Sequence, residues 1–287
     1  MILSLPTLIG CMAILLWSCL ALFTAATGII PPFELAAITF AISGAAGLAL
    51  AAIRSELGAL KQPPAVWALG IFGLFGYHAL YFSALRLAPP AEAGLIAYLW
   101  PLLIVLFSAL LPGERLQLKH IGGALLGLAG VIVLIGGAKL AKGEGFAFEA
   151  KYLPGYLLAF ACAFVWSGYS VLSRRFKNVP TMAVTGFCIV TALLSLLCHA
   201  LFEATVWPQN LSQTLAMGAL GLGPVGLAFF VWDYGVKNGD IRFLGVASYG
   251  APVLSTLILV LTGFTPASWS LGLACALIVG GALVATR

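Results

Sequence analysis

The chain consists almost entirely of long apolar blocks separated by short polar connections. Of its 287 residues, 62% are hydrophobic and only 8% are charged, whereas a soluble domain carries roughly 25% charged residues. A helix of about 20 apolar residues crosses the hydrocarbon core of a bilayer. The sequence therefore predicts an all-α membrane protein with ten transmembrane helices, near residues 4–26, 33–54, 63–86, 91–111, 119–137, 154–175, 181–203, 212–237, 241–262 and 267–285.

The first apolar block, residues 4–26, is too long for the apolar region of a secretory signal, and no charged segment precedes it. We expect it to be retained as the first membrane helix. The longest connection runs from Ala138 to Leu153, so no soluble domain is expected between the spans.

Basic residues fall mostly on one side of the predicted bundle. One side receives Arg54, Lys61, Arg115, Lys119, Arg174, Arg175, Lys177, Lys237, Arg242 and Arg287, and the other receives Arg86, Lys139, Lys142 and Lys151. Loops that are rich in Lys and Arg stay in the cytoplasm. We therefore expect both termini to be cytoplasmic.

Matching residues recur at nearly one separation along the chain, which indicates an internal repeat. The pairs are Trp17 with Trp166 (149 residues apart), Tyr98 with Tyr249 (151 apart) and Gly122 with Gly272 (150 apart). We expect a first five-helix repeat over residues 1–137, a connecting loop over 138–153 and a second repeat over 154–287. Because five is odd, the second repeat must enter the membrane from the opposite side. The two repeats are then inverted, an architecture that recurs in secondary transporters.

Two prolines occupy equivalent places in this repeat. Pro101 and Pro252 lie about ten residues into their predicted helices, and each follows a tyrosine by three residues. Proline removes a backbone hydrogen-bond donor, and a helix break inside a membrane is tolerated where it lines a cavity or packs on protein. An ordinary kink is the alternative. We predict a symmetry-related pair of hinges at these prolines.

Many aromatic residues with polar groups lie well inside their helices rather than in belts at the membrane surfaces. A central cavity would give their hydroxyl and indole N–H groups partners, although some of these rings could simply pack between helices. We predict that the substrate-binding residues are Trp17, Tyr77, His78, Tyr81, Tyr98, Trp100, Trp166, Tyr169, Trp232 and Tyr249.

Ionisable side chains inside the spans are few. His78 lies deep in the third predicted helix and Asp233 in the eighth, whereas Glu34, Glu92 and Glu203 lie at helix ends, where we expect them to be solvated. An essential membrane carboxylate is typical of proton-coupled antiporters. Asp233 gives little support for such coupling because it could extend toward nearby water or pair with a cytoplasmic Arg. We favour passive transport down the substrate gradient.

Other functional classes lack their sequence signals. The chain has no zinc-protease, nucleotide-binding or nucleophile-elbow motif, so we expect neither an enzyme nor a cofactor or metal. Its six cysteines lie in apolar stretches without ligand spacing. The basic residues form no stripe for nucleic acid. Small residues at helical spacing, Gly123 with Gly127 and Ala276 with Gly280, favour close helix packing within a monomer.

Three segments of the chain resemble a known family. They are Ala13-Ile14-Leu15-Leu16-Trp17-Ser18, Tyr98-Leu99-Trp100-Pro101-Leu102 and Ala247-Ser248-Tyr249-Gly250-Ala251-Pro252-Val253-Leu254. With ten spans in two repeats, the whole chain is similar to the EamA-type branch of the drug/metabolite transporter superfamily.

This resemblance implies export of amino acids, including aromatic and other neutral ones, across the inner membrane of a bacterium. It also implies a cavity walled by both repeats. Tyr98, Trp100, Tyr249 and the two prolines fall on motif positions, and Tyr77, His78 and Tyr81 fall on the third-helix face that lines the cavity.

Two other functions remain open at this stage. An exporter of another small metabolite or drug, with or without proton coupling, belongs to the same superfamily. A transporter of phosphorylated substrates would need Lys or Arg facing the cavity, and no span carries one near its middle. An intramembrane enzyme or scaffold lacks the catalytic groups.

Overall fold

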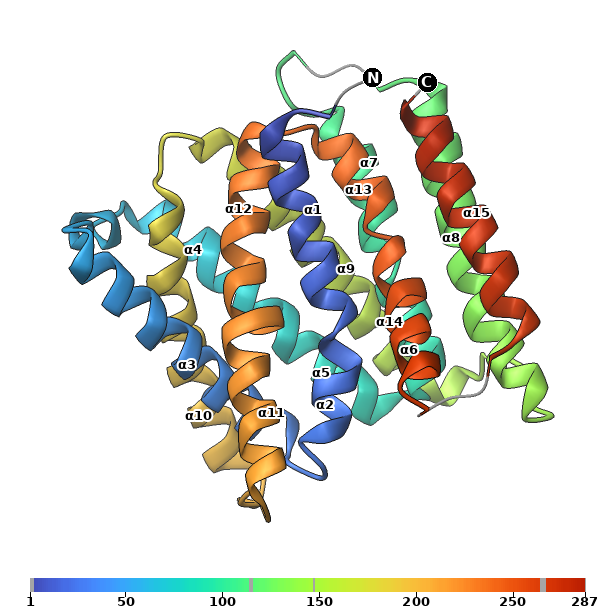
Figure 1. The fold of residues 1–287 in the computed structure, drawn as a ribbon, viewed down its shortest axis with the longest axis horizontal. Coiled ribbons are helices and arrows are strands. Elements are labelled where there is room, and N and C mark those ends of the chain that lie inside the picture. Colours follow the sequence, from blue (N-terminus) through green and yellow to red (C-terminus); the bar gives the residue numbers. More distant parts are fainter. Residues whose placement is uncertain (1–2, 114–115, 147, 264–266, 287) are drawn as a thin grey trace.

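The computed structural model describes residues 3–113, 116–146, 148–263 and 267–286, and every regular element in that part of the chain is a helix (Figure 1). Nine helical segments there are long and apolar enough to cross a membrane. The all-α prediction is confirmed, and the prediction of ten spans is confirmed for nine. At the tenth position the described residues hold a shorter apolar helix, Trp269–Ala285. The predicted basic residues Arg115 and Arg287 lie outside the described residues.

The N-terminal half of the chain contains α1 (Leu5–Ser18), α2 (Leu20–Ala26), α3 (Pro32–Ile53), α4 (Pro64–Ile71), the π-helix η2 (Phe72–Gly76), α5 (Tyr77–Leu87), α6 (Pro90–Ala97), α7 (Trp100–Ser108) and α8 (Leu118–Ala141). The C-terminal half contains α9 (Leu153–Leu172), α10 (Val184–Phe202), α11 (Leu211–Leu222), the π-helix η6 (Gly223–Leu227), α12 (Ala228–Asn238), α13 (Ile241–Ala247), α14 (Gly250–Leu261) and α15 (Trp269–Thr286). Short 3₁₀ turns are η1 (Leu57–Leu60), η3 (Ala150–Tyr152), η4 (Ser173–Phe176) and η5 (Thr181–Ala183).

The two halves share local irregularities at equivalent positions. The π-helices η2 and η6 begin at Phe72 and Gly223, which are 151 residues apart, and each is followed by an 11-residue helix, α5 or α12. π-Helices are rare and often mark functional sites. Sequence reasoning did not predict either of them.

Both spans with the predicted hinge prolines break just before the proline. The first break separates α6 from α7 at Tyr98 and Leu99, and the second separates α13 from α14 at Ser248 and Tyr249. Each proline then lies in the first turn of the new helix. This position tolerates proline because the first backbone N–H groups of a helix have no partner within it.

Close helix pairs hold the bundle together, among them α8 with α15, α3 with α10, α1 with α12 and α5 with α9. A Cβ at Gly123 would meet the backbone of Gly281, and a Cβ at Gly127 would meet the ring of Tyr249. The predicted packing glycines Gly123 and Gly127 therefore act within one chain. On α15 the contact residue is Gly281 and not Gly280, which has open space beside it.

Figure 1 shows that α1 begins and α15 ends at the same end of the bundle, called here the proximal end. The opposite end is called the distal end. The tip of the α5–α6 hairpin lies at the distal end, and the tip of the α12–α13 hairpin lies at the proximal end. These two segments, residues 77–97 and 228–247, are called the distal and proximal hairpins.

Candidate functional site

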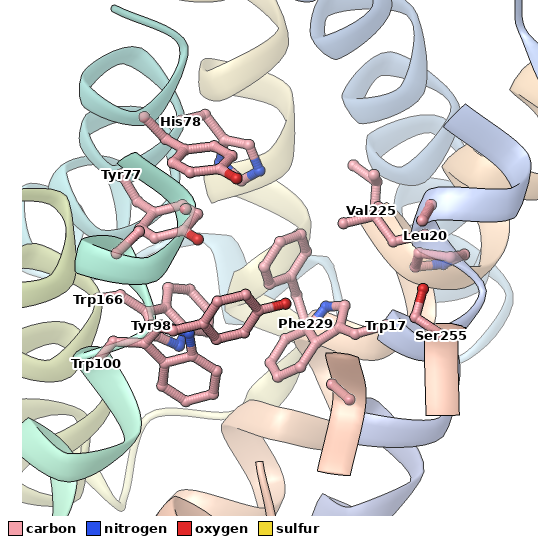
Figure 2. Close-up of a pocket in the computed structure, with 16 residues that line it drawn as sticks. Trp17, Leu20, Tyr77, His78, Tyr98, Trp100, Trp166, Val225, Phe229 and Ser255 are labelled. Atoms are coloured by element: carbon pink, nitrogen blue, oxygen red, sulfur yellow. The ribbon is translucent and has the colours of Figure 1, made fainter. Parts of the chain in front are cut away.

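A cavity of about 190 Å³ lies inside the bundle, between the breaks of both halves (Figure 2). Its walls come from α1, α2, α5, α6, α7 and α9 and from η6, α12 and α14. The lining residues are Trp17, Leu20, Ala21, Tyr77, His78, Tyr81, Gly94, Ala97, Tyr98, Trp100, Trp166, Pro224, Val225, Phe229, Ala251 and Ser255. From the level of Trp17 this lining extends toward the distal ends of the helices.

Four tryptophans close the proximal side of the cavity. The ring of Trp17 lies 6.2 Å from that of Trp100, 5.7 Å from that of Trp166 and 5.1 Å from that of Trp232. These rings come from α1, α7, α9 and α12, so both halves contribute to this floor. Edge-to-face aromatic pairs add about 0.5–1.5 kcal/mol each beyond the burial of their area.

Seven of the ten predicted binding residues line the cavity: Trp17, Tyr77, His78, Tyr81, Tyr98, Trp100 and Trp166. Tyr77 and Tyr81 stack with ring centres 5.9 Å apart, one helical turn from each other on α5. His78 has its Nδ1 2.7 Å from the carbonyl oxygen of Leu74. A carbonyl only accepts hydrogen bonds, so Nδ1 carries a hydrogen and Nε2 is the ring atom left for a ligand.

Three predicted residues do not line the cavity. Trp232 is the floor ring that does not reach the cavity, and it is fully buried with its indole N–H donating to the Ser170 hydroxyl at 3.1 Å. Tyr169 packs against Trp166 and the backbone of Gly73. Tyr249 is fully buried against α8, in the space that Gly127 leaves. The two hinge prolines lie behind the lining as well, although Ala251, the neighbour of Pro252, is part of it.

Sequence reasoning missed several lining residues. Phe229 faces the cavity from α12, and it lies 151 residues after His78. The repeat offset applied to His78 would have identified it. Pro224 and Val225 line the cavity because the π-helix η6 turns them inward, and no periodicity in the sequence indicated that. Ser255 is a small polar residue among apolar neighbours, a pattern too common to single out.

The lining residues include no Lys, Arg, Asp or Glu. The polar groups are the hydroxyls of three tyrosines and Ser255, the His78 ring and the indole N–H groups. The aromatic faces carry partial negative charge, which attracts an ammonium group. The cavity therefore offers weak, distributed polar contacts beside a large apolar area, which is typical of small-molecule sites.

The acidic residues at helix ends correct an expectation. Glu34, Glu92 and Glu203 were expected to be solvated, yet the structure buries all three side chains. The Glu203 carboxylate accepts the backbone N–H groups of Phe33 and Glu34 at 3.1 Å and the Arg86 guanidinium at 2.6 Å. It thereby caps the N-terminus of α3, where negative charge is favourable.

A second buried acid holds the other side of the distal hairpin. Glu92, in the first turn of α6, lies 3.1 Å from the Lys139 ammonium and accepts the Tyr156 hydroxyl at 2.6 Å. Through Arg86 and Glu92, the tip of this hairpin is therefore tied to α10, α8 and α9.

Polar contacts also fix the proximal hairpin. Asp233 pairs with Lys237 at 2.9 Å and accepts the Thr181 hydroxyl at 2.8 Å. The Lys237 ammonium also donates to the carbonyl of Val179. Both charged side chains are nearly inaccessible, at 2% and 6% exposure. Asp233 is therefore paired with a lysine of its own helix and withdrawn from solvent, rather than pairing with a cytoplasmic Arg or reaching water as expected.

A bundle of apolar helices around an internal, uncharged aromatic cavity is an architecture that suits a membrane transporter. The chain belongs to the EamA-like transporter family, whose pattern matches residues 5–136 and again residues 153–287.

Named relatives support this assignment. The chain is 63% identical to the aromatic amino acid exporter YddG of Ancylobacter novellus over 284 residues, 99% of this chain and 97% of that one. It is 28% identical to the YddG of Salmonella typhimurium, with 97% and 95% coverage. A crystal structure with 63% sequence identity superimposes with a TM-score of 0.93, covering 98% of this chain and 96% of that chain.

Proposed function

We propose that this protein exports amino acids, including aromatic and other neutral ones, across a bacterial inner membrane. The observation that carries the proposal is the central cavity, whose lining combines aromatic faces with hydroxyl and indole groups and no fixed charge. Such a lining suits the ammonium group that all amino acids share, together with varied side chains. The names of the relatives agree with it, since both exporters align with nearly the whole chain.

The proposed architecture is two inverted five-helix repeats, residues 1–137 and 154–287, joined by a loop. The double match of the family pattern supports it, as do the equivalent π-helices and helix breaks. The proximal end is then cytoplasmic and holds both termini, since ten of the 14 Lys and Arg belong to that side.

The proposed mechanism is alternating access by the two hairpins. Each hairpin is bounded by a π-helix at one end and by a helix break beside Pro101 or Pro252 at the other. In this structure the proximal hairpin closes onto α1, where Gly235 meets Gly10, and the cavity lies on the distal side of the tryptophan floor. Opening the proximal hairpin and closing the distal one would present the same site to the cytoplasm.

Transport is proposed to be passive, down the substrate gradient. A proton-coupled exporter of another small metabolite or drug is the second candidate, and the buried Asp233 favours it. The ion pair with Lys237 supports the passive reading, because it gives the Asp233 carboxylate a fixed counter-ion one helical turn away.

Flux into liposomes tests the proposal. Purified protein should equilibrate labelled phenylalanine, tryptophan and threonine across the bilayer without a pH gradient. An imposed pH gradient should not drive accumulation. Flux no greater than that of empty liposomes for every amino acid tested would contradict the function, and accumulation driven by the pH gradient would replace the passive mechanism with the coupled one.

A further inference from the structure

A second cavity, of about 820 Å³, lies on the other side of η6 and α12 from the central one. Its main walls are α3 on one side and η6 with α12 on the other, with contributions from η1, η5 and α1. The lining residues are Ile9, Ser43, Ala46, Gly47, Leu50, Arg54, Glu56, Ala59, Pro180, Thr181, Met182, Gly221, Leu222, Gly226, Leu227, Phe230, Val231 and Tyr234. The proposed transport path does not use it.

This cavity opens laterally, toward the lipid that surrounds the bundle. Leu50, Leu222 and Leu227 line it and are 39%, 55% and 47% exposed, although each belongs to a span apolar enough to cross a bilayer. Apolar side chains that are exposed at this depth are in contact with hydrocarbon. Since most of the lining is apolar, water would find few hydrogen-bonding partners inside. An acyl chain is the group that such a space accommodates.

The proximal mouth of the cavity carries one positive and one negative side chain. Arg54 and Glu56 both line the cavity and are exposed, and neither forms an ion pair within the part of the chain that the structure describes. Arg54 is the C-cap residue that follows α3, and Ser55 then adopts a positive φ of 57°. This turn brings the two charged residues to the same mouth, at the level where the span leaves the hydrocarbon.

Opposite charges above an apolar cavity match a lipid whose headgroup carries both signs. A guanidinium binds phosphate through two parallel hydrogen bonds, and a carboxylate binds an ammonium group. A lipid with an anionic headgroup has no ammonium group. It would place an acidic or neutral group against Glu56 and leave that carboxylate without a positive partner. A free amino acid shares the two charges but would leave the apolar depth of the cavity empty.

We propose that this cavity binds one phospholipid with an amine-bearing, zwitterionic headgroup, such as phosphatidylethanolamine. One acyl chain lies between α3 and α12, the phosphate is bound by Arg54 and the ammonium group by Glu56. The site lies in the proximal leaflet and is distinct from the central cavity.

Native mass spectrometry of the full chain in detergent, titrated with phosphatidylethanolamine or phosphatidylglycerol of the same acyl chains, tests the proposal. Wild-type protein should retain one phosphatidylethanolamine in preference to phosphatidylglycerol. Arg54→Gln should weaken retention of phosphatidylethanolamine by about tenfold, which corresponds to about 1.4 kcal/mol, because the charge-assisted hydrogen bonds to the phosphate are lost. Glu56→Gln should abolish the preference between the two lipids. Lys61→Gln, at an exposed residue outside the cavity lining, is the charge control.

A large side chain introduced into this cavity should exclude the acyl chain of the lipid. Ala46 lines the cavity and Ala49, one turn away on the same helix, is exposed but does not. Ala46→Trp should lose the bound lipid and Ala49→Trp should retain it. Equal retention by these two variants, equal affinity of the wild type for the two lipids, or displacement of the lipid by free amino acid would overturn the proposal. None of these readouts depends on transport.

Discussion

The distal and proximal hairpins have the same local structure and opposite surroundings. Each begins with an 11-residue helix after a π-helix and ends at a helix break. On α5 only Ala84 is buried, whereas seven residues of α12 are buried, among them Trp232, Asp233 and Lys237. Equivalent segments thus line an open cavity in one half and form a packed closure in the other. What differs is tertiary packing and not local conformation.

Two equivalent tyrosines of the two halves also have different roles. Tyr98 and Tyr249 occupy the same place in the Tyr-x-x-Pro motif, but only Tyr98 lines the cavity. Tyr249 fills the space beside Gly127 between α8 and the second half. The same sequence signal therefore marks a binding residue once and a packing residue once.

The largest expected effect on transport is at the tryptophan floor, which separates the cavity beside the distal hairpin from the packed closure formed by the proximal hairpin. Trp17→Ala removes a ring that contacts four other aromatic rings, and large-to-small changes of this kind cost about 3–5 kcal/mol in a packed core. We expect initial amino-acid flux in liposomes to fall by at least about tenfold.

Trp269→Ala is the matched control, because Trp269 is 68% exposed and lies far from the cavity lining. Its flux should equal that of wild type. A Trp17→Ala variant with unchanged flux would show that the floor is not part of the transport path.

The next largest effect is expected at the close contact between α12 of the proximal hairpin and α1. A Cβ at Gly235 would collide with the backbone of Gly10, and overpacking costs about 1–3 kcal/mol. Gly235→Ala should separate α12 from α1 and slow transport several-fold. Gly218→Ala, on α11 with open space beside it, should not. Equal flux in the two variants would mean that this close approach is dispensable for closure.

The ties of the distal hairpin should have a smaller effect on stability. Arg86→Gln removes one partner of a buried carboxylate, but Glu203 keeps its backbone donors and Arg86 is 45% exposed. We expect the free energy of unfolding, measured with heat or denaturant, to fall by about 1–2 kcal/mol.

A double-mutant cycle with Glu203→Gln measures the coupling of this pair. The exposed pair Lys151–Glu149, at 60% and 50% exposure, is the control and should couple by under about 1 kcal/mol. Coupling between Arg86 and Glu203 that is no larger than in the control pair would show that this ion pair does not hold the distal hairpin in place.

The smallest expected effects are changes in apparent KM, which should differ between variants of the two Tyr-x-x-Pro tyrosines. Tyr98→Phe removes a hydroxyl from the cavity lining and should change the apparent KM for amino acids a few-fold, with little change in stability. Tyr249→Phe should leave KM unchanged because its ring does not reach the cavity. Equal KM changes in both variants would mean that the second repeat presents Tyr249 to the substrate in another state.

The sequence predicted most of the fold because its dominant signal is apolar block length, which the bilayer enforces directly. Polar aromatic residues inside the spans identified seven lining residues, and the repeat offset located the paired prolines where both helices break. It could not separate Tyr98 from Tyr249, since the difference depends on a glycine of another helix. The burial of Glu34, Glu92 and Glu203 was missed because each acid finds its partners across long sequence separations, such as Arg86 with Glu203.

The central claim, that the hairpins open alternately, is tested most directly by the accessibility of two introduced cysteines. Ser255 lines the cavity on the distal side of the floor, and Ser170 is fully buried beneath it beside Trp232. In a background without the six native cysteines, Ser255→Cys and Ser170→Cys should be labelled by a water-soluble maleimide before and after amino acid is added. We predict that substrate changes the two labelling rates in opposite directions. Rates that rise or fall together would contradict alternating access and indicate a channel.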